Sequence, residues 1–138
     1  MKKIIATLLV IIIAFTGMDA HAASYPEWRP DAPLPEKPHL TKSGGVFMGP
    51  SGKETYYNLP MGNVINSMRD LGYDVETYPY WIRPDGAKML GEYVICAADY
   101  GTRPKGTILE TSLGYAIVCD TGSFAKSNKT QIDLAVDW

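Results

Sequence analysis

The sequence predicts a mainly β fold, on three observations. Two short, wholly apolar runs, residues 93–98 and 115–119, are each followed by Asp-x-Gly, as expected of buried strands that end in turns. Residues 131–138 alternate between apolar and polar side chains, the period of a strand with one buried face. Two strand-like stretches at 45–48 and 54–57 surround the turn residues 49–52, which predicts an N-terminal hairpin.

The first 22 residues predict a signal peptide. Lys2 and Lys3 precede an uncharged apolar run, Ile4–Phe15, and Ala20-His21-Ala22 has the small-x-small pattern of a cleavage site. The run is shorter than the roughly 18 to 20 residues that a membrane-spanning helix needs. We therefore expect a secreted or cell-wall-associated protein with no integral membrane span after processing. An uncleaved membrane anchor is the alternative.

Residues 23–43 predict a linker and residues 44–138 a single domain. The linker is extended because five prolines stand among polar residues in it. Within the domain, Pro60 suits the first turn of a short helix and Gly72 suits its stop. Apolar residues lie between them at helical spacing: Val64, Ile65, Met68 and Leu71.

The net charge and the length of the chain limit the partners that it could bind. The chain carries a net charge of −2, and loss of Lys2, Lys3 and Asp19 with residues 1–22 changes this to about −3. Such a mildly acidic chain is a poor match for nucleic acid or an anionic membrane. The remaining 116 residues suffice for one domain, which we expect to be a monomer.

The two cysteines leave the redox state open. Cys96 and Cys119 are an even pair in a chain expected to be exported, which permits a disulfide, but both lie in apolar runs where a buried free thiol is equally expected. Only His39 remains after removal of the signal peptide, and no CxxC motif exists. We therefore expect no metal and no cofactor.

Three aspartates are the candidate catalytic residues. Asp99 and Asp120 follow the two buried strands, where the backbone emerges at the rim of a sheet or barrel, and Asp133 lies in the alternating segment. A half-buried carboxyl group near a like charge has a raised pKa, as a general acid for glycosidic cleavage requires. The competing interpretation is that Asp before Gly serves a turn. For Asp133 it is a solvated position on a half-buried strand.

The same residues resemble the three-aspartate (3D) domain family. The motif matches are an apolar strand, Asp99 and then Pro104-Lys105-Gly106-Thr107; the strand 114–119 followed by Asp120-Thr121-Gly122; and Gln131-Ile132-Asp133-Leu134. Together they cover about Gly91 to Trp138. The resemblance implies a six-stranded double-psi β-barrel, here with a short helix and an N-terminal hairpin. It also implies kinship with the catalytic barrel of membrane-bound lytic transglycosylase A.

The resemblance further implies a peptidoglycan-cleaving enzyme of the cell wall that acts on glycan strands. Asp120 matches the aspartate that acts first as acid and then as base on the β-1,4 bond after N-acetylmuramic acid. Asp99 and Asp133 match its two supporting aspartates. Substrate binding is expected of Gly122, Thr121, Phe124 and Lys105.

Two other functions remain open. Ser123 and Phe124 replace the Gly and the small residue that usually follow this motif. The enzymes of the resemblance bind the glycan in a groove between the barrel and a second domain, and here only a short segment is available for the second wall of such a groove. Both observations favour a non-catalytic glycan-binding module in which the aspartates brace loops. A hydrolase in which Asp99 or Asp133 activates water is the third alternative. The sequence also offers aromatic residues, Tyr57 among them, for stacking on sugars, although aromatics in strands are more often part of a core.

Overall fold

The computed structural model describes residues 37–138. The predicted signal peptide (1–22) and most of the predicted linker (23–43) lie outside the described residues. Eight strands and two helices form the described part, in the order β1 (Phe47–Gly49), β2 (Gly52–Tyr57), α2 (Gly62–Asp70), β3 (Tyr80–Ile82), β4 (Lys88–Leu90), β5 (Tyr93–Ala97), β6 (Ile108–Thr111), β7 (Gly114–Asp120), α3 (Phe124–Ser127) and β8 (Ile132–Ala135). The prediction of a mainly β domain is confirmed.

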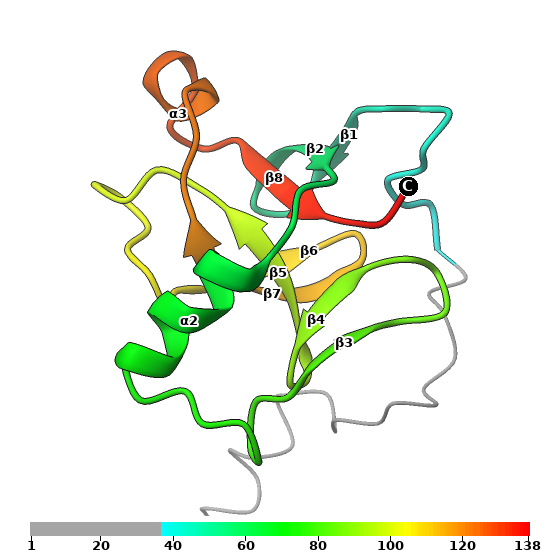
Figure 1. Cartoon of the computed structure of the whole chain (residues 1–138). Helices are drawn as coiled ribbons and strands as arrows, with labels where there is room; N and C mark the ends of the chain where they lie inside the picture. The colour runs from blue at the N-terminus through cyan, green and yellow to red at the C-terminus, as the bar shows by residue number, and fades with distance from the viewer. Residues whose placement is uncertain (1–36) are drawn as a thin grey trace, which may run out of the picture.

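All eight strands belong to one mixed sheet, which is not closed (Figure 1). Its main order is β1-β2-β8-β5-β4-β3, and β7 adds to β5 and carries β6 on its other side. β1 and β2 pair antiparallel across the turn at Pro50 and Ser51. The sheet thus has eight strands where the sequence predicted six.

Strand β5 is the centre of the sheet. It pairs in parallel with β7 and antiparallel with β8, so the two strands that carry Asp120 and Asp133 run on either side of it. Ala97 is the register partner of Asp120 in β7 and of Asp133 in β8. The backbones at the two aspartates are therefore about two strand spacings apart, roughly 9–10 Å.

Two apolar clusters form the core. The first includes Val94, Cys96 and Leu134, and the second includes Ile95 and Ile117, so alternate residues of β5 contribute to different clusters. Helix α2 joins the second cluster through Met68, which is fully buried, and lies beside the end of β7 that carries Asp120 (Figure 1). The central strands are therefore buried on both sides, as their uninterrupted apolar sequences predicted.

The ordered domain begins before Gly44. Leu40, inside the predicted linker, is fully buried in the first cluster, and its backbone N–H donates to Ser112 Oγ at 2.9 Å. The last residues of the predicted linker therefore pack on the domain. They do not form a free spacer.

The predicted helix is present over Gly62–Asp70, inside the expected 60–72 interval. Gly72 ends it with a φ of +101°, a conformation that suits glycine, and Tyr73 N–H donates to Met68 O. Leu71 lies beyond the last helical residue and is 58% exposed, so it does not join the buried face. None of the helices between residues 37 and 138 combines the length and the apolar character needed to cross a membrane.

The cysteines are free thiols. Cys96 and Cys119 are both buried, and they belong to different core clusters. Each thiol donates to the same carbonyl, Ile117 O, at 3.4 and 3.5 Å respectively. Burial raises the pKa of the Cys96 thiol well above its usual value and raises that of Cys119 to about 12. Both thiols are therefore inert at neutral pH.

Candidate functional site

A row of four neighbouring positions crosses the sheet at the candidate site. Thr55 in β2 pairs with Asp133 in β8, which pairs with Ala97 in β5, which pairs with Asp120 in β7. Cross-strand partners extend to the same face of a sheet, so this row places two carboxylates on one face with a methyl group between them. The register shifts between Cys96 and Ala97, at the point where β5 meets Asp120. Such irregularities re-aim side chains at the ends of strands.

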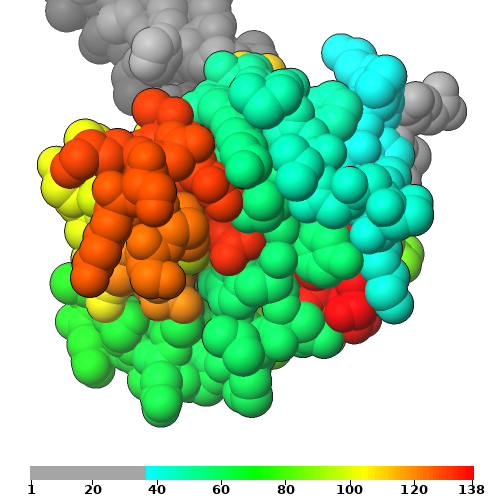
Figure 2. Space-filling view, turned by 90° about the horizontal axis from the view of Figure 1, so that it is seen from above, coloured from blue at the N-terminus to red at the C-terminus, as the bar shows by residue number. Residues whose placement is uncertain are grey.

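The two aspartates line a pocket of about 350 Å³. Ala97 forms part of the wall between them, and its small side chain leaves the space above β5 open. The rest of the pocket is lined by Tyr57, Leu59, Thr121, Gly122, Ser123 and Phe124. Figure 2 shows this hollow between the orange surface around α3 and the green surface of the β2–α2 segment, with red β8 atoms between them.

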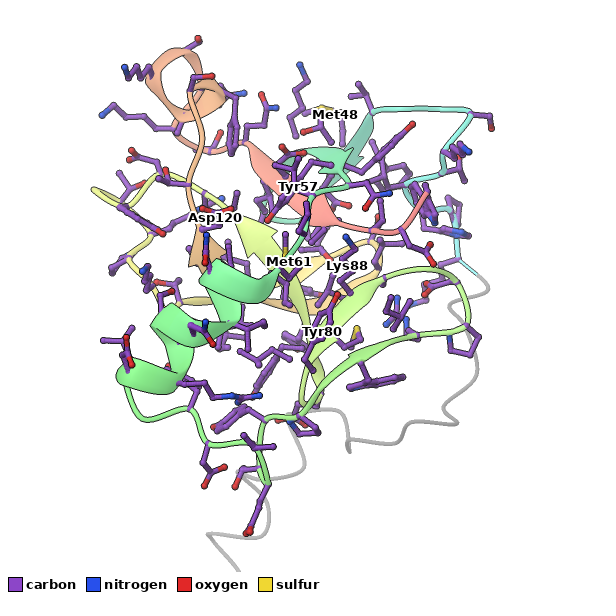
Figure 3. The ribbon with its side chains drawn as sticks, in the orientation of Figure 1. Met48, Tyr57, Met61, Tyr80, Lys88 and Asp120 are labelled. Carbon is purple, nitrogen blue, oxygen red and sulfur yellow. The ribbon has the colours of Figure 1, made fainter. Side chains whose placement is uncertain are left out.

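Asp120 is the last residue of β7 and is half-buried. Its Oδ1 accepts a hydrogen bond from the backbone N–H of Thr121 at 2.8 Å, and its Oδ2 accepts one from the Tyr57 hydroxyl at 3.5 Å. Figure 3 shows Tyr57 and Asp120 in the upper part of the molecule, on segments 63 residues apart in the chain. The carboxylate is thus held by two neutral donors and faces open space.

Asp133 lines the same pocket and is also half-buried. Burial raises the pKa of its carboxyl group, the Thr55 hydroxyl opposes the rise by donating to Oδ1 at 2.9 Å, and the charge of Asp120 adds to it. The group therefore keeps its proton to higher pH than an exposed aspartate does. This is the property expected of a carboxyl group that supports acid catalysis.

Asp99 is not part of the pocket lining. Its Oδ2 accepts hydrogen bonds from the backbone N–H and the hydroxyl of Thr102, and its backbone carbonyl accepts one from Arg103 N–H. The Thr102 hydroxyl lowers the pKa of this carboxyl group, and Lys129 contributes to the shift. Two of the three predicted aspartates thus meet at the pocket, and the third closes a turn.

The predicted substrate-binding residues divide in the same way. Thr121, Gly122 and Phe124 line the pocket, whereas Lys105 does not. The ammonium group of Lys105 donates to Ser67 Oγ at 3.1 Å and lies 5.8 Å from the centre of the Tyr100 ring.

The Phe124 ring packs directly against the backbone of Gly122. A Cβ at Gly122 would lie 2.9 Å from two atoms of that ring. Phe124 is itself half-buried and leaves Asp120 accessible.

The sequence interpretation missed the roles of Thr55, Tyr57 and Ala97. The sequence pattern of Tyr57 is typical of a core residue or of a sugar-stacking residue, and neither interpretation predicts that its hydroxyl donates to Asp120. Burial raises the pKa of Tyr57, and the charge of Asp120 raises it further, so the phenol stays a hydrogen-bond donor throughout the neutral range. The available signal was the i, i+2 spacing of Thr55 and Tyr57, which places both hydroxyls on one face of a strand.

A larger pocket, of about 460 Å³, lies elsewhere, between the β1–β2 turn, residues near Lys37 and the β6–β7 turn. It contains none of the three aspartates, and its mostly apolar lining includes Phe47, Met48 and Pro50. We assign the candidate site to the smaller pocket because the two carboxyl groups converge there. Across residues 37–138, no three His, Cys, Asp or Glu side chains are grouped as a metal ion would require.

Comparisons with protein-family models, with curated proteins and with solved structures give no match to this chain.

Proposed function

We propose that this chain is a secreted or wall-associated enzyme that cleaves the β-1,4 bond between N-acetylmuramic acid and N-acetylglucosamine in peptidoglycan. The observation that carries the proposal is the pocket in which Asp120 and Asp133 meet beside Tyr57 and Phe124. Its volume of about 350 Å³ lies at the lower end of the roughly 300–1,000 Å³ of small-molecule sites. A sugar ring has the polar edge and apolar face that such a lining accommodates.

In the proposed reaction Asp120 acts first as acid and then as base. It protonates the oxygen that leaves with N-acetylglucosamine and then accepts the proton of the muramic 6-hydroxyl group, as that oxygen attacks the anomeric carbon. The products are an anhydro-muramic end and a free sugar hydroxyl, and no water is consumed. Asp133 lines the same pocket, where burial and the charge of Asp120 raise the pKa of the Asp133 carboxyl group.

We also propose that the sheet is an opened form of the double-psi β-barrel that the resemblance to the 3D domain family implies. The support is the parallel pairing of β5 and β7. β7 ends at Asp120, and β5 ends at Ala97, two residues before Asp99. The pairing of β8 with both β2 and β5 is further support, since it brings the ends of the domain together.

The test is zymography on peptidoglycan with the wild type and Asp120→Asn, followed by mass spectrometry of released fragments. We expect clearing by the wild type and a loss of at least about a hundredfold in the variant, because removal of a general acid typically costs 10² to 10⁴ in rate. Anhydro-muramic ends in the fragments support the lytic transglycosylase. Equal clearing by both proteins, or none by the wild type, contradicts the assignment.

A non-catalytic glycan-binding module is the second candidate, and Phe124 favours it because its ring occupies part of the wall beside Asp120. Binding of wild type and Asp120→Asn to chito-oligosaccharides with equal affinity, without cleavage, would support this module. Reducing ends in the fragments would indicate a hydrolase. In that enzyme Asp133, which lines the pocket, would activate water, because Asp99 does not line it.

A further inference from the structure

Strand β2 supplies a hydroxyl group to each of the two aspartates. Thr55 Oγ1 donates to Asp133 Oδ1 at 2.9 Å, and the Tyr57 hydroxyl donates to Asp120 Oδ2 at 3.5 Å. The two donors are two residues apart on one strand, so they lie on the same face. This strand lies outside the segment, about Gly91 to Trp138, in which the resemblance to the 3D domain family is found.

The Thr55 contact is fixed by backbone pairing and by a third residue. β2 and β8 are parallel neighbours in which Thr55 is the direct partner of Asp133. The side-chain amide of Gln131 donates to Thr55 Oγ1 at 3.0 Å. That amide uses a lone pair of the hydroxyl oxygen, so the hydroxyl hydrogen is available for Asp133. The result is a directed chain of hydrogen bonds from Gln131 through Thr55 to the carboxylate.

The second contact joins Tyr57 to Asp120. At 3.5 Å the hydrogen bond is long, as contacts in ligand-free catalytic sites often are before a substrate tightens them. Since Tyr57 also lines the pocket, a bound ring would lie against it and against Asp120 at once.

Neutral hydroxyl groups hold the side chains of Asp120 and Asp133 in place, whereas many other carboxylates in proteins are held by cations. Among residues 37–138 the salt bridge joins Arg83 and Asp85, neither of which lines this pocket. Neither Asp120 nor Asp133 has a salt-bridge partner among those residues. A cation would hold both aspartates ionised, whereas a hydroxyl fixes a carboxyl group in place and still lets it carry a proton.

We propose that Thr55 and Tyr57 are positioning residues that hold Asp133 and Asp120 at the pocket, so that β2 is an integral part of the site. Their contribution to turnover rests on the proposed function, but the contacts themselves do not. Besides burial and Thr55, the charge of Asp120 from β7 acts on the pKa of Asp133, and Asp133 in turn contributes to the raised pKa of the Tyr57 phenol from β2 and of the Cys96 thiol from β5.

The first test is a carboxyl titration of the full-length protein, labelled with ¹³C at aspartate and followed by NMR. In Thr55→Val, which keeps the shape of the side chain and loses the hydroxyl, we expect the pKa of Asp133 to rise above its wild-type value. Thr55→Ser keeps the hydroxyl and is expected to keep the wild-type titration. If Thr55→Val does not fold, Thr55→Ala replaces it. An unchanged titration of Asp133 in the hydroxyl-free variant overturns the role of Thr55.

The second test compares Tyr57→Phe with Tyr56→Phe. Tyr56 is its neighbour on the opposite face of β2, where it donates to Lys42 O and packs edge-on against Trp138, so it is a matched control. We expect the Asp120 carboxyl signal to shift in Tyr57→Phe and to stay unchanged in Tyr56→Phe. If the Asp120 carboxyl signal is the same in Tyr57→Phe and in Tyr56→Phe, Tyr57 has no positioning role.

Kinetics separate this proposal from the proposed function. In peptidoglycan cleavage, Thr55→Val and Tyr57→Phe are each expected to lower kcat roughly tenfold with KM nearly unchanged, and Tyr56→Phe to stay within about twofold. Absence of cleavage by the wild type contradicts the enzyme, while the titrations still decide the positioning roles. Normal kcat in both hydroxyl-free variants of a cleaving enzyme contradicts the positioning roles alone.

Discussion

At the scale of single residues, Asp99 is expected to stabilise the loop after β5 and to contribute little to chemistry. Its carboxylate accepts two hydrogen bonds from Thr102. Asp99→Ala should therefore lower the melting temperature at pH 7 by a few degrees. In the proposed peptidoglycan cleavage, its rate should stay within about threefold of wild type, unlike that of Asp120→Asn.

The pH dependence of this effect follows from the lowered pKa of Asp99. Because the Thr102 hydroxyl lowers the folded pKa below the usual 3.8, the carboxylate stabilises the fold above that pH. This contribution is lost as the pH falls through the folded pKa. The difference in melting temperature between wild type and Asp99→Ala should therefore be largest near neutral pH and shrink below about pH 4. A difference that stays constant from pH 7 to pH 3 would contradict this role.

Residue patterns predicted part of the site. Asp120 and Asp133 follow from their positions at the end of one strand and in the alternating pattern of another. Asp99 has the same Asp-x-Gly pattern as Asp120. Only the loop beyond Asp99, in which the Thr102 backbone N–H donates to the Asp99 carboxylate, shows that Asp99 serves a turn. Tyr57 escaped prediction because an aromatic residue in a strand looks the same in sequence whether its hydroxyl is buried or meets a carboxylate.

At the scale of elements, the β6–β7 turn is joined to β2 by a buried carboxyl group. Glu54 is fully buried, and it accepts hydrogen bonds from the backbone N–H and the hydroxyl of Ser112. The same hydroxyl oxygen accepts the backbone N–H of Leu40. Gly49 leaves the necessary room, since a Cβ there would overlap the Glu54 carboxylate. Ser112 thus connects three segments that are distant in the sequence.

Ser112→Ala should destabilise the protein by about 1–3 kcal/mol, because it removes the hydroxyl hydrogen bond of the buried Glu54 carboxylate and leaves the Leu40 backbone N–H without its acceptor. Burial raises the pKa of Glu54 and the Ser112 hydrogen bonds oppose that rise, so the variant has a still higher folded pKa. A raised carboxyl pKa reduces stability as the pH rises above 4.5 and through the folded pKa. Urea unfolding should therefore show a greater loss of stability at pH 7 than at pH 4.

The control for this experiment is Ser67→Ala, in which the lost hydroxyl donates to Val64 O within helix α2 and accepts a hydrogen bond from the exposed Lys105 ammonium group. Its effect should be small and independent of pH in this range. An equal loss at both pH values in Ser112→Ala would mean that the Glu54 proton is not involved.

Element types were predictable from periodicity, but their order in the sheet was not. The helix and the strands β5, β7 and β8 follow from apolar spacing, which reports the faces that an element buries. The pairing of β2 with β8 joins Thr55 to Asp133, 78 residues away, and leaves no trace in either local pattern. The branch at β5, which β4 and β8 share along one edge, is equally invisible in the sequence.

At the scale of the whole molecule, the segment before β1 closes the core. Leu40 is fully buried although it lies among residues with the composition of a linker. Leu40→Ala should cost about 2–5 kcal/mol of unfolding free energy, the usual range for a large-to-small change in a core. Leu71→Ala, at a leucine that is 58% exposed, is the matched control and should change stability by no more than about 0.5 kcal/mol. Similar losses in both variants would show that the segment around Leu40 does not contribute to the core.

Arg103 is a second connection at this scale. Its guanidinium group donates to Ser51 O at 2.7 Å and to Thr130 O at 3.0 Å, and its backbone N–H donates to Asp99 O. The β1–β2 turn, the loop after β5 and the loop before β8 are thereby tied together. Arg103 does not line the pocket, so it holds these three segments together from outside the pocket.

The two sequestered thiols give the protein an internal reporter of its own opening. Cys96 and Cys119 sit on adjacent central strands, so an alkylating reagent reaches them only after those strands separate. The modification rate in native buffer would then measure how often the central strands separate. Denaturant should accelerate the modification, and the dependence of the rate on denaturant should be steeper the more surface the opening exposes. Because Cys96 and Cys119 are free thiols, we expect the unfolded protein to refold in a reducing buffer.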